Sequence, residues 1–290
     1  MSEARGKRRH FSLTLRGRAE TLGTRTWVMG ILNVTPDSFS DGGVHEAHDR
    51  ALSRGLSLFE AGADILDVGG ESTRPGAEAV SPDEERRRVV PVIAALRARG
   101  AGPISVDTTK AEVAAAALDA GADIVNDVSG FRFDPGLAPL VAGRRVPAVL
   151  MHLRGEWGTM HRAPAYEDVM GEVQSELREV LRGATGQGVG EDQIIVDPGL
   201  GFSKDAGHSL EVLRRLPELR ALGRPILAGP SRKSFIGKVL GSGVKERLMG
   251  TAAAVAACIL GGAHIVRIHD VAELMDVVRV CDAVLGAGAP

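Results

Sequence analysis

Eight short apolar runs constrain the fold of this 290-residue chain more than any other feature of its sequence. Each run is continuous rather than alternating, as is typical of parallel strands that helices cover. Longer amphipathic stretches separate the runs, and we expect helices at 46–61, 82–99, 110–119, 135–142, 167–186, 208–222, 246–260 and 270–285. The predicted strands are Trp27–Asn33, Asp64–Gly69, Ile104–Asp107, Ile124–Val128, Ala148–His152, Ile194–Asp197, Ile226–Gly229 and Ile265–His269.

Eight strand–helix units in about 260 residues predict an α/β fold, the (β/α)8 TIM barrel. A weak internal repeat supports this, because Ala61–Asp67 (AGADILD) and Ala120–Asn126 (AGADIVN) share a helix end, a glycine turn and a buried strand. The alternative is a doubly wound open sheet. We rank it lower, because eight similar strands with no dominant glycine-rich phosphate fingerprint fit a closed barrel better.

The N-terminal segment differs from the rest of the chain. Phe11, Leu13 and Leu15 alternate with polar residues and a glycine turn follows, so we expect a short β-hairpin that plugs the N-terminal end of the barrel. Residues 1–10 are polar and basic, and we predict a disordered tail there. Residues 11–290 are predicted to form a single domain.

Composition excludes several classes of protein. Lys and Arg total 35 against 37 for Asp and Glu, and aromatic residues make up 3% of the chain, which argues against a nucleic-acid partner. The longest apolar run, Ala252–Leu260, is far too short to span a membrane, and residues 1–10 lack a secretory pattern. Cys258 and Cys281 lie in apolar helical segments and are predicted to be core thiols. We therefore expect a cytoplasmic protein without a membrane partner.

A dense charge run, Glu84–Arg88, lies within the predicted helix 82–99. We interpret it as the solvated face of that helix.

Polar residues end the predicted strands, and in a barrel these positions line one active-site mouth. A single Asp at such a position could merely cap the next helix, but every strand delivers a polar group. One set suits a flat heterocycle, because two carboxylates, an amide and an ammonium can pair with the donors and acceptors of a ring. Its members are Asp107, Asn126, Asp197 and Lys233.

A second set of residues suits an anion. Arg267 and His269 lie two apart on one strand and therefore point to the same face. With Asn33 on the adjacent first strand, they could hold a phosphate or a phosphate-bound Mg²⁺. The predicted helix start at Ser231–Lys233 adds backbone N–H groups for a further anion.

Two loops are candidate lids. Val34–Gly43 and Glu71–Gly76 are rich in Gly, Pro, Ser and Thr, and the first carries a single large apolar residue, Phe39. We predict that Phe39 closes over a bound ring.

These motifs together are similar to those of bacterial dihydropteroate synthases. Gly30–Gly43 (GILNVTPDSFSDGG) resembles the first family signature and Asp67–Gly76 (DVGGESTRPG) the second. Pro230 before the Ser-Arg-Lys run and Leu153–Trp157 after Met-His depart from the family pattern. Five shorter pieces follow in the family's order: Ser105–Thr108, Val125–Ser129, Asp197–Phe202, Ser231–Phe235 and Arg267–Asp270.

The resemblance implies an enzyme that joins 4-aminobenzoate to 6-hydroxymethyl-7,8-dihydropterin pyrophosphate, with Mg²⁺ as cofactor. The last two predicted helices, 246–260 and 270–285, are rich in Ala and Val, and we expect a homodimer formed through them. It implies pyrophosphate binding by Asn33, Arg267 and His269, with Asn33 also a metal ligand. The implied pterin residues are Asp67, Asp107, Asn126, Asp197 and Lys233, with Met151 and Phe202 as apolar walls.

The lids and the aminobenzoate site also follow from the resemblance. Thr73, Arg74, Pro75 and Ser231 are expected around the aminobenzoate and the second lid, and Phe39 and Asp41 in the first lid. The residues implied in catalysis are Asn33, Asp41, Lys233, Arg267 and His269.

The expected chemistry is a dissociative substitution, in which pyrophosphate leaves and the neutral arylamine attacks the resulting cation. Two alternatives remain. A pterin-dependent methyltransferase shares the barrel and the pterin groups but needs neither a pyrophosphate clamp nor the first lid. A non-catalytic pterin-binding homologue would be expected to have lost lid or anion residues.

Overall fold

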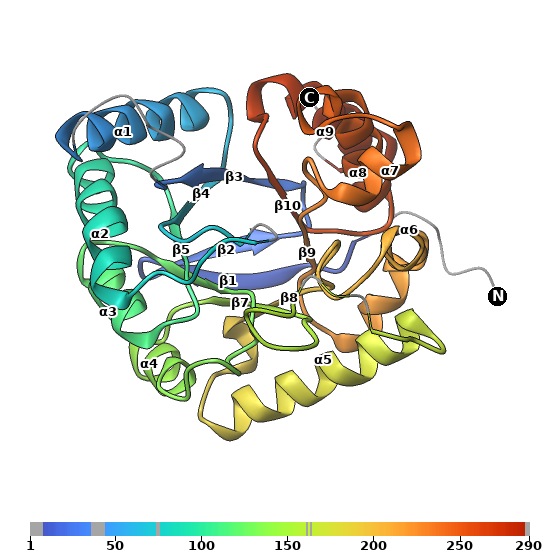
Figure 1. Ribbon diagram of the computed structural model, residues 1–290, viewed down its shortest axis with the longest axis horizontal. Coiled ribbons are helices and arrows are strands. Elements are labelled where there is room, and N and C mark those ends of the chain that lie inside the picture. Colours follow the sequence, from blue (N-terminus) through green and yellow to red (C-terminus); the bar gives the residue numbers. More distant parts are fainter. Residues whose placement is uncertain (1–7, 36–43, 74–75, 161, 163, 288–290) are drawn as a thin grey trace.

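The computed structural model describes residues 8–35, 44–73, 76–160, 162 and 164–287. Eight parallel strands form a ring at its centre, with helices outside them (Figure 1). The strands are paired in the order β8-β7-β6-β5-β4-β3-β10-β9, and one parallel bridge between Val196 and Ile226 brings the two ends together. This arrangement confirms the predicted barrel and excludes an open sheet. The strands are β3 (Trp27–Asn33), β4 (Ile65–Gly69), β5 (Ile104–Asp107), β6 (Ile124–Asp127), β7 (Ala148–Met151), β8 (Ile194–Asp197), β9 (Leu227–Ala228) and β10 (Ile265–Ile268).

The helices follow the strands and cover the outside of the ring (Figure 1). Capping fixes where some of them begin. The Ser81 side chain accepts a hydrogen bond from the Glu84 N–H, and proline occupies the first position of α2, where its missing N–H costs nothing. The helices are α1 (Val44–Glu60), α2 (Pro82–Ala98), α3 (Ala111–Asp119), α4 (Leu137–Arg144), α5 (Val169–Gly186), α6 (Ala206–Arg214), α7 (Ser234–Leu240), α8 (Leu248–Leu260) and α9 (Val271–Val284).

Three predicted elements differ from those observed. The helix expected at 208–222 is split into α6 and a 3₁₀ segment, Leu216–Leu222, because Pro217 cannot continue an α-helix. The strand expected at Ile226–Gly229 is shorter than predicted, because β9 comprises only Leu227–Ala228. The helix start predicted at Ser231–Lys233 belongs to a separate short helix, α7, which begins at Ser234 and whose extent was not predicted.

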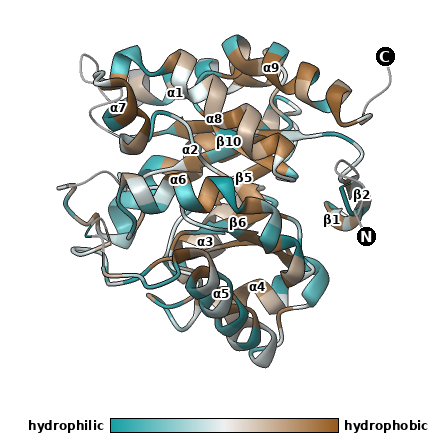
Figure 2. Ribbon diagram, turned by 90° about the vertical axis from the view of Figure 1, so that its right-hand side faces the viewer, coloured by the Kyte–Doolittle hydropathy of each residue, from teal (hydrophilic) through white to brown (hydrophobic). Residues whose placement is uncertain are grey.

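The N-terminal hairpin is confirmed and plugs the barrel. Strands β1 (Phe11–Leu15) and β2 (Arg18–Leu22) pair antiparallel and lie at one end of the molecule (Figure 2). Leu13, Leu15 and Leu22 are buried in one cluster with apolar side chains from the barrel strands: Trp27, Met29, Ile65, Ile124, Val149, Ile195, Leu227 and Ile265. The hairpin therefore completes the interior of the barrel at the end opposite the strand carboxyl ends.

The chain just before the hairpin also packs on the barrel. The Arg8 guanidinium donates to Asp282 over 2.7 Å, and the same carboxylate accepts from the N–H and the hydroxyl of Thr26. Residues 1–7 of the expected tail lie outside the described residues. Arg8 itself belongs to the folded barrel.

The charge run on α2 is not wholly solvated, and the prediction for Glu85 is wrong. Glu85 is fully buried and accepts a hydrogen bond from Lys110 Nζ over 2.5 Å. It precedes Val89 by one helical turn and so shares the face of α2 that packs against the barrel.

Cys258 and Cys281 are buried free thiols, as predicted. No helix within the described part of the chain is long and apolar enough to cross a membrane.

Candidate active site

The strand register gathers the predicted polar residues at one mouth of the barrel. Asn33 pairs with Gly69, Gly69 with Asp107, and Asp107 with Asn126, so these positions form one row across β3 to β6. The row borders a pocket that extends to β8, β10 and the N-terminus of α7. The residues that line it are Thr73, Asp107, Asn126, Val128, Met151, Asp197, Leu200, Phe202, Gly229, Lys233 and Arg267.

Six of the seven expected pterin residues line this pocket, and Asp67 lies behind it. Asp67 is fully buried, and its Oδ2 accepts from Asn126 Nδ2 over 2.9 Å and from Arg267 Nε over 2.6 Å. Asp67 therefore orients two pocket side chains rather than facing the cavity.

Arg267 joins the two predicted sets of residues. Its Nη2 donates to Asp107 Oδ2 over 2.6 Å, while its Nε holds Asp67. The two predicted sets of residues are therefore adjacent, because the arginine that is predicted to bind an anion also neutralises a carboxylate of the heterocycle pocket.

Burial brings the pocket's charged groups close to their titration points. It raises the pKa of Asp107 to about 7, although the charge of Arg267 opposes the change. It also raises the pKa of Asp197, against the Gly199 N–H that donates to this carboxylate over 2.7 Å. Burial and the nearby Arg267 lower the pKa of Lys233 to about 8. The Lys233 ammonium lies 3.9 Å from the ring centre of Phe202, a cation–π contact that fixes one apolar wall.

The anion residues form a second hydrogen-bonded group. Ser231 Oγ lies 3.0 Å from His269 Nδ1 and accepts from the His269 N–H. In the tautomer in which Ser231 donates its proton to Nδ1, His269 Nε2 carries the ring proton and is the donor. Burial and the neighbouring Arg267 lower the pKa of His269 to about 3, so the imidazole is neutral. The resemblance placed Ser231 near the aminobenzoate, whereas here it pairs with His269.

The second predicted lid has a fixed base. Glu71 Oε1 accepts from the Val80 N–H over 2.6 Å, which ties the two ends of the loop together. Lys110 Nζ bridges Glu71 and Glu85. Sequence analysis missed this ion-pair cluster. Thr73 lines the pocket, whereas Phe39, Asp41, Arg74 and Pro75 lie outside the described residues.

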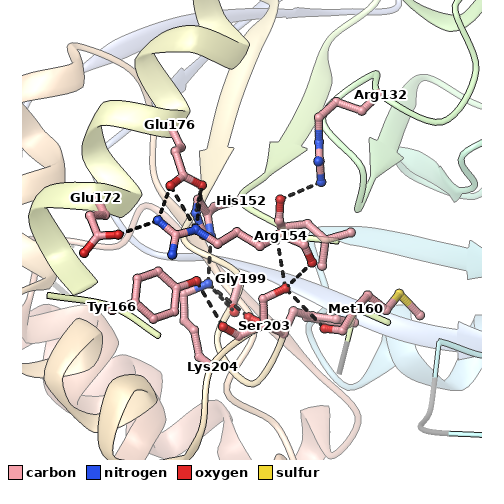
Figure 3. Close-up of polar contacts among 12 residues, drawn as sticks. Arg132, His152, Arg154, Met160, Tyr166, Glu172, Glu176, Gly199, Ser203 and Lys204 are labelled. Atoms are coloured by element: carbon pink, nitrogen blue, oxygen red, sulfur yellow. Dashed lines mark hydrogen bonds and ion pairs between the residues drawn. The ribbon is translucent and has the colours of Figure 1, made fainter. Parts of the chain in front are cut away.

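A second buried network was also missed. His152 lies between Lys204 Nζ, 2.8 Å from its Nδ1, and Glu176 Oε2, 3.0 Å from its Nε2 (Figure 3). His152 is hydrogen-bonded on both ring nitrogens and does not line the pocket. One feature of the sequence could have indicated this network. Lys204 ends the Gly199–Lys204 segment (GLGFSK), whose glycines allow the turn to pack closely on the barrel.

Residues 29–269 match the family model described as pterin binding enzyme. The dihydropteroate synthase of Synechocystis sp. is 50% identical over 262 residues, which cover 90% of this chain and 91% of that protein. The chain belongs to the dihydropteroate synthase family.

Solved structures of the family have the same fold. Dihydropteroate synthase of Xanthomonas albilineans with 4-aminobenzoic acid superposes with a TM-score of 0.89 at 47% identity, over 97% of this chain and 100% of that chain. The same enzyme in complex with 7,8-dihydropteroate gives a TM-score of 0.85 at 45% identity, over 96% and 100% of the two chains. The family similarity therefore extends over the barrel and the mouth that carries the site.

Proposed function

We propose that this chain joins 4-aminobenzoate to 6-hydroxymethyl-7,8-dihydropterin pyrophosphate, giving 7,8-dihydropteroate and pyrophosphate in folate biosynthesis. The observation that carries the proposal is Arg267, which touches the heterocycle pocket and borders the anion residues. A substrate that joins a flat ring to a pyrophosphate through one carbon fits this arrangement.

Ring recognition follows from the donors and acceptors in the pocket. The carboxylates of Asp107 and Asp197 accept from ring N–H groups, the Asn126 amide can do both, and Lys233 donates to a ring carbonyl or nitrogen. Met151 and Phe202 supply apolar walls for the faces of the ring. Such a pocket rejects near-isosteres, because each would leave a buried polar group unpaired.

The mechanism is charge neutralisation of the leaving group. Arg267 and the Nε2–H of His269 stabilise the departing pyrophosphate, and the electron-rich dihydropterin stabilises the cation left at its exocyclic carbon. Among the described lining residues, Asp107 is engaged by Arg267 and Asp197 by Gly199. We infer that pyrophosphate leaves before the neutral arylamine attacks, and that positioning replaces base catalysis.

The site also suits Mg²⁺ carried by the substrate. Asn33, half-buried at the end of β3, offers a hard amide oxygen, and Mg²⁺ prefers oxygen ligands while retaining several waters. No cluster of three or more His, Cys, Asp or Glu side chains capable of holding a metal occurs in the described ranges. We therefore propose that oxygens of the pyrophosphate would supply further ligands to Mg²⁺ beside Asn33. The bound ion would neutralise part of the negative charge of the leaving pyrophosphate. Excess chelator should stop turnover, and full activity in chelator would overturn the metal assignment.

A turnover assay tests the proposed function. The purified protein should release pyrophosphate and form dihydropteroate only when both substrates and Mg²⁺ are present. Pterin binding without release would favour the non-catalytic homologue. Methyl transfer from a methylated pterin, with no use of the pyrophosphate, would favour the methyltransferase.

We propose a homodimer formed through the α7–α8 face. Val239, Leu240 and Met249 are exposed there, with Val239 61% and Met249 78% accessible. An apolar surface of this kind is typical of an interface. Sedimentation should give a dimer for the wild type and a monomer for Met249→Asp, and a monomeric wild type would refute the assembly. The sequence predicted a dimer face on the last two helices, which are α8 and α9. The surface proposed here includes α8.

We also propose a cytoplasmic location and small-molecule substrates as the partners. Two free buried thiols, Cys258 and Cys281, support a reducing compartment.

A further inference from the structure

Lys204 is a buried ammonium whose three protons all have acceptors. The side chain does not line the pocket and is 5% exposed. Its Nζ donates to His152 Nδ1 over 2.8 Å, to the Gly199 carbonyl over 3.2 Å and to the Phe202 carbonyl over 3.1 Å (Figure 3). An ammonium has three N–H donors, so this environment uses all of them.

The two carbonyls belong to the turn that follows β8. Gly199 has a positive φ of 68°, and a Cβ there would fall 2.2 Å from the His152 carbonyl oxygen, so only glycine fits. The Phe202 N–H closes the turn onto the Gly199 carbonyl over 3.0 Å. The turn is therefore pressed against His152, and Lys204 joins both of its ends to that residue.

This turn carries two contacts of the heterocycle pocket. At its start, the Gly199 N–H holds the Asp197 carboxylate. At its end, the Phe202 ring lies over the Lys233 ammonium. Lys204 thus acts on a carboxylate and an apolar wall that face the ring, without touching the ring itself.

The network continues to the surface of helix α5 (Figure 3). His152 Nε2 lies against Glu176, and Arg154 Nε donates to the same carboxylate over 2.9 Å. Ser203 adds a second connection, because its Oγ donates to the Arg154 carbonyl over 2.6 Å. The turn after β8 and the loop after β7 are consequently held as one unit.

We propose that Lys204 is a positioning residue for pterin binding, whose ammonium holds the Gly199–Phe202 turn and thereby keeps Asp197 and Phe202 in place for the ring. The inference rests on the proposed function, since it takes the pocket to be the pterin site. A preorganised pocket binds more tightly because less order has to be created on binding.

The positioning requires the charged form of Lys204. A neutral amine has two N–H donors for three acceptors, so one acceptor loses its partner. His152 cannot compensate, because moving its proton to Nδ1 would leave a bare Nε2 against the Glu176 carboxylate. Burial lowers the pKa of Lys204 to about 7; Asp197 and Glu176 oppose this change, whereas Arg154 and Lys233 reinforce it. The support therefore weakens as pH rises through neutrality.

The first test compares wild type with Lys204→Met by calorimetric titration of 6-hydroxymethylpterin, a ring without phosphate, from pH 6 to pH 9. Loss of a buried hydrogen-bonding group predicts about tenfold weaker binding at pH 6. The affinity ratio should fall as pH rises to 9, where the wild-type lysine is neutral and donates two N–H groups rather than three. Asp107 titrates in both proteins, and its contribution cancels in the ratio. KM for the pterin substrate should change more than kcat.

The matched control is Lys238→Met, an exposed lysine on α7, which should bind as the wild type does at every pH. A purely structural role for Lys204 would give a ratio that does not depend on pH.

The second test does not alter a deeply buried residue. Glu176 is partly exposed, and Glu176→Gln keeps an oxygen acceptor while removing the negative charge that favours the ammonium of Lys204. The loss of the Lys204 ammonium should shift to lower pH, so the ratio of wild-type to Glu176→Gln pterin affinity should be greatest near neutral pH. Glu179→Gln on the same helix faces Arg182 instead and should cause no shift.

The outcomes distinguish a failure of the proposed function from a failure of the proposed role of Lys204. A wild type that binds no pterin at any pH overturns the proposed function. A wild type that binds, with a pH-independent Lys204→Met ratio or with equal affinities, overturns the role of Lys204. If Lys204→Met does not fold, the Glu176→Gln shift decides alone, and its absence overturns the inference.

Discussion

Asp197 shows how one residue serves both the fold and the chemistry. Its carboxylate accepts from the Gly199 N–H and lines the pocket, where we propose that it also accepts from a ring N–H. Asp197→Asn keeps an oxygen for Gly199 but presents an amide donor to a ring donor. We expect pterin affinity to fall by about ten- to one-hundredfold, the cost of a buried mismatch of roughly 1–3 kcal/mol. Calorimetry measures it, with the exposed Asp119→Asn on α3 as control, and unchanged affinity would mean that the pocket is wrongly assigned.

Burial raises the pKa of Asp107 to about 7, and the charge of Arg267 opposes that rise. We propose that the carboxylate is the form that accepts from the ring, so the contribution of Asp107 to pterin affinity should rise with pH through about 7. Arg267→Met removes the cation that lowers this pKa, and the rise should then move to higher pH. Titrations between pH 6 and pH 9 test the shift. An unmoved profile would contradict the contact between Arg267 and Asp107. Turnover of the variant should also fall, because the pyrophosphate loses its arginine.

At the scale of elements, the Glu71–Lys110–Glu85 cluster connects α2, the start of α3 and the base of the second loop. Lys110→Met leaves two carboxylates without their cation, and breaking a buried pair in this way costs about 3–5 kcal/mol of unfolding free energy.

The pH dependence of that loss has a definite sign. Burial raises the pKa of Glu85, while Lys110 opposes the rise. Without Lys110 the folded state holds its proton to higher pH, so the loss should be smaller at pH 5 than at pH 8. Urea unfolding at both values measures it, and the exposed Lys245→Met serves as control. Equal losses at pH 5 and pH 8 would argue against a buried carboxylate as the cause.

The sequence predicted elements wherever hydrophobic pattern and chain direction decide the structure. Strands β3, β5 and β8 have the bounds expected from their apolar runs, and the strand ends correctly placed Asp107 and Asn126 in the pocket. Short segments carry no such pattern, so the start of α7 was predicted but its extent was not.

Buried charges were missed for a different reason. Whether Glu85 or Lys204 is solvated depends on partners far along the chain, Lys110 in one case and His152 in the other. Likewise, the contact of Arg267 with Asp107 joins β10 to β5 across the mouth of the barrel, and sequence spacing does not predict it.

At the scale of the whole molecule, the barrel separates stability from chemistry. The hairpin packs into one end and the site lies at the other. Leu22→Ala should lower the free energy of unfolding by about 2–5 kcal/mol, because Leu22 is fully buried in the plug. Pterin affinity should remain unchanged, as measured on the folded variant. A parallel loss of affinity would show that the two ends are coupled.

The proposed mechanism requires a fixed order of events at the mouth of the barrel. If pyrophosphate leaves first, the aminobenzoate site is complete only when pterin, pyrophosphate and Mg²⁺ are in place. The ligands must then favour one another's binding to the same degree, because coupling between sites is reciprocal.

Equilibrium titration of 4-aminobenzoate tests this claim most directly. It is performed first with the free protein and then with protein saturated with pterin, pyrophosphate and Mg²⁺. We expect 4-aminobenzoate to bind at least about tenfold more tightly in the second titration, which is within the usual range of coupling free energies. Equal affinities in the two titrations would show a preformed aminobenzoate site and contradict the ordered, dissociative mechanism.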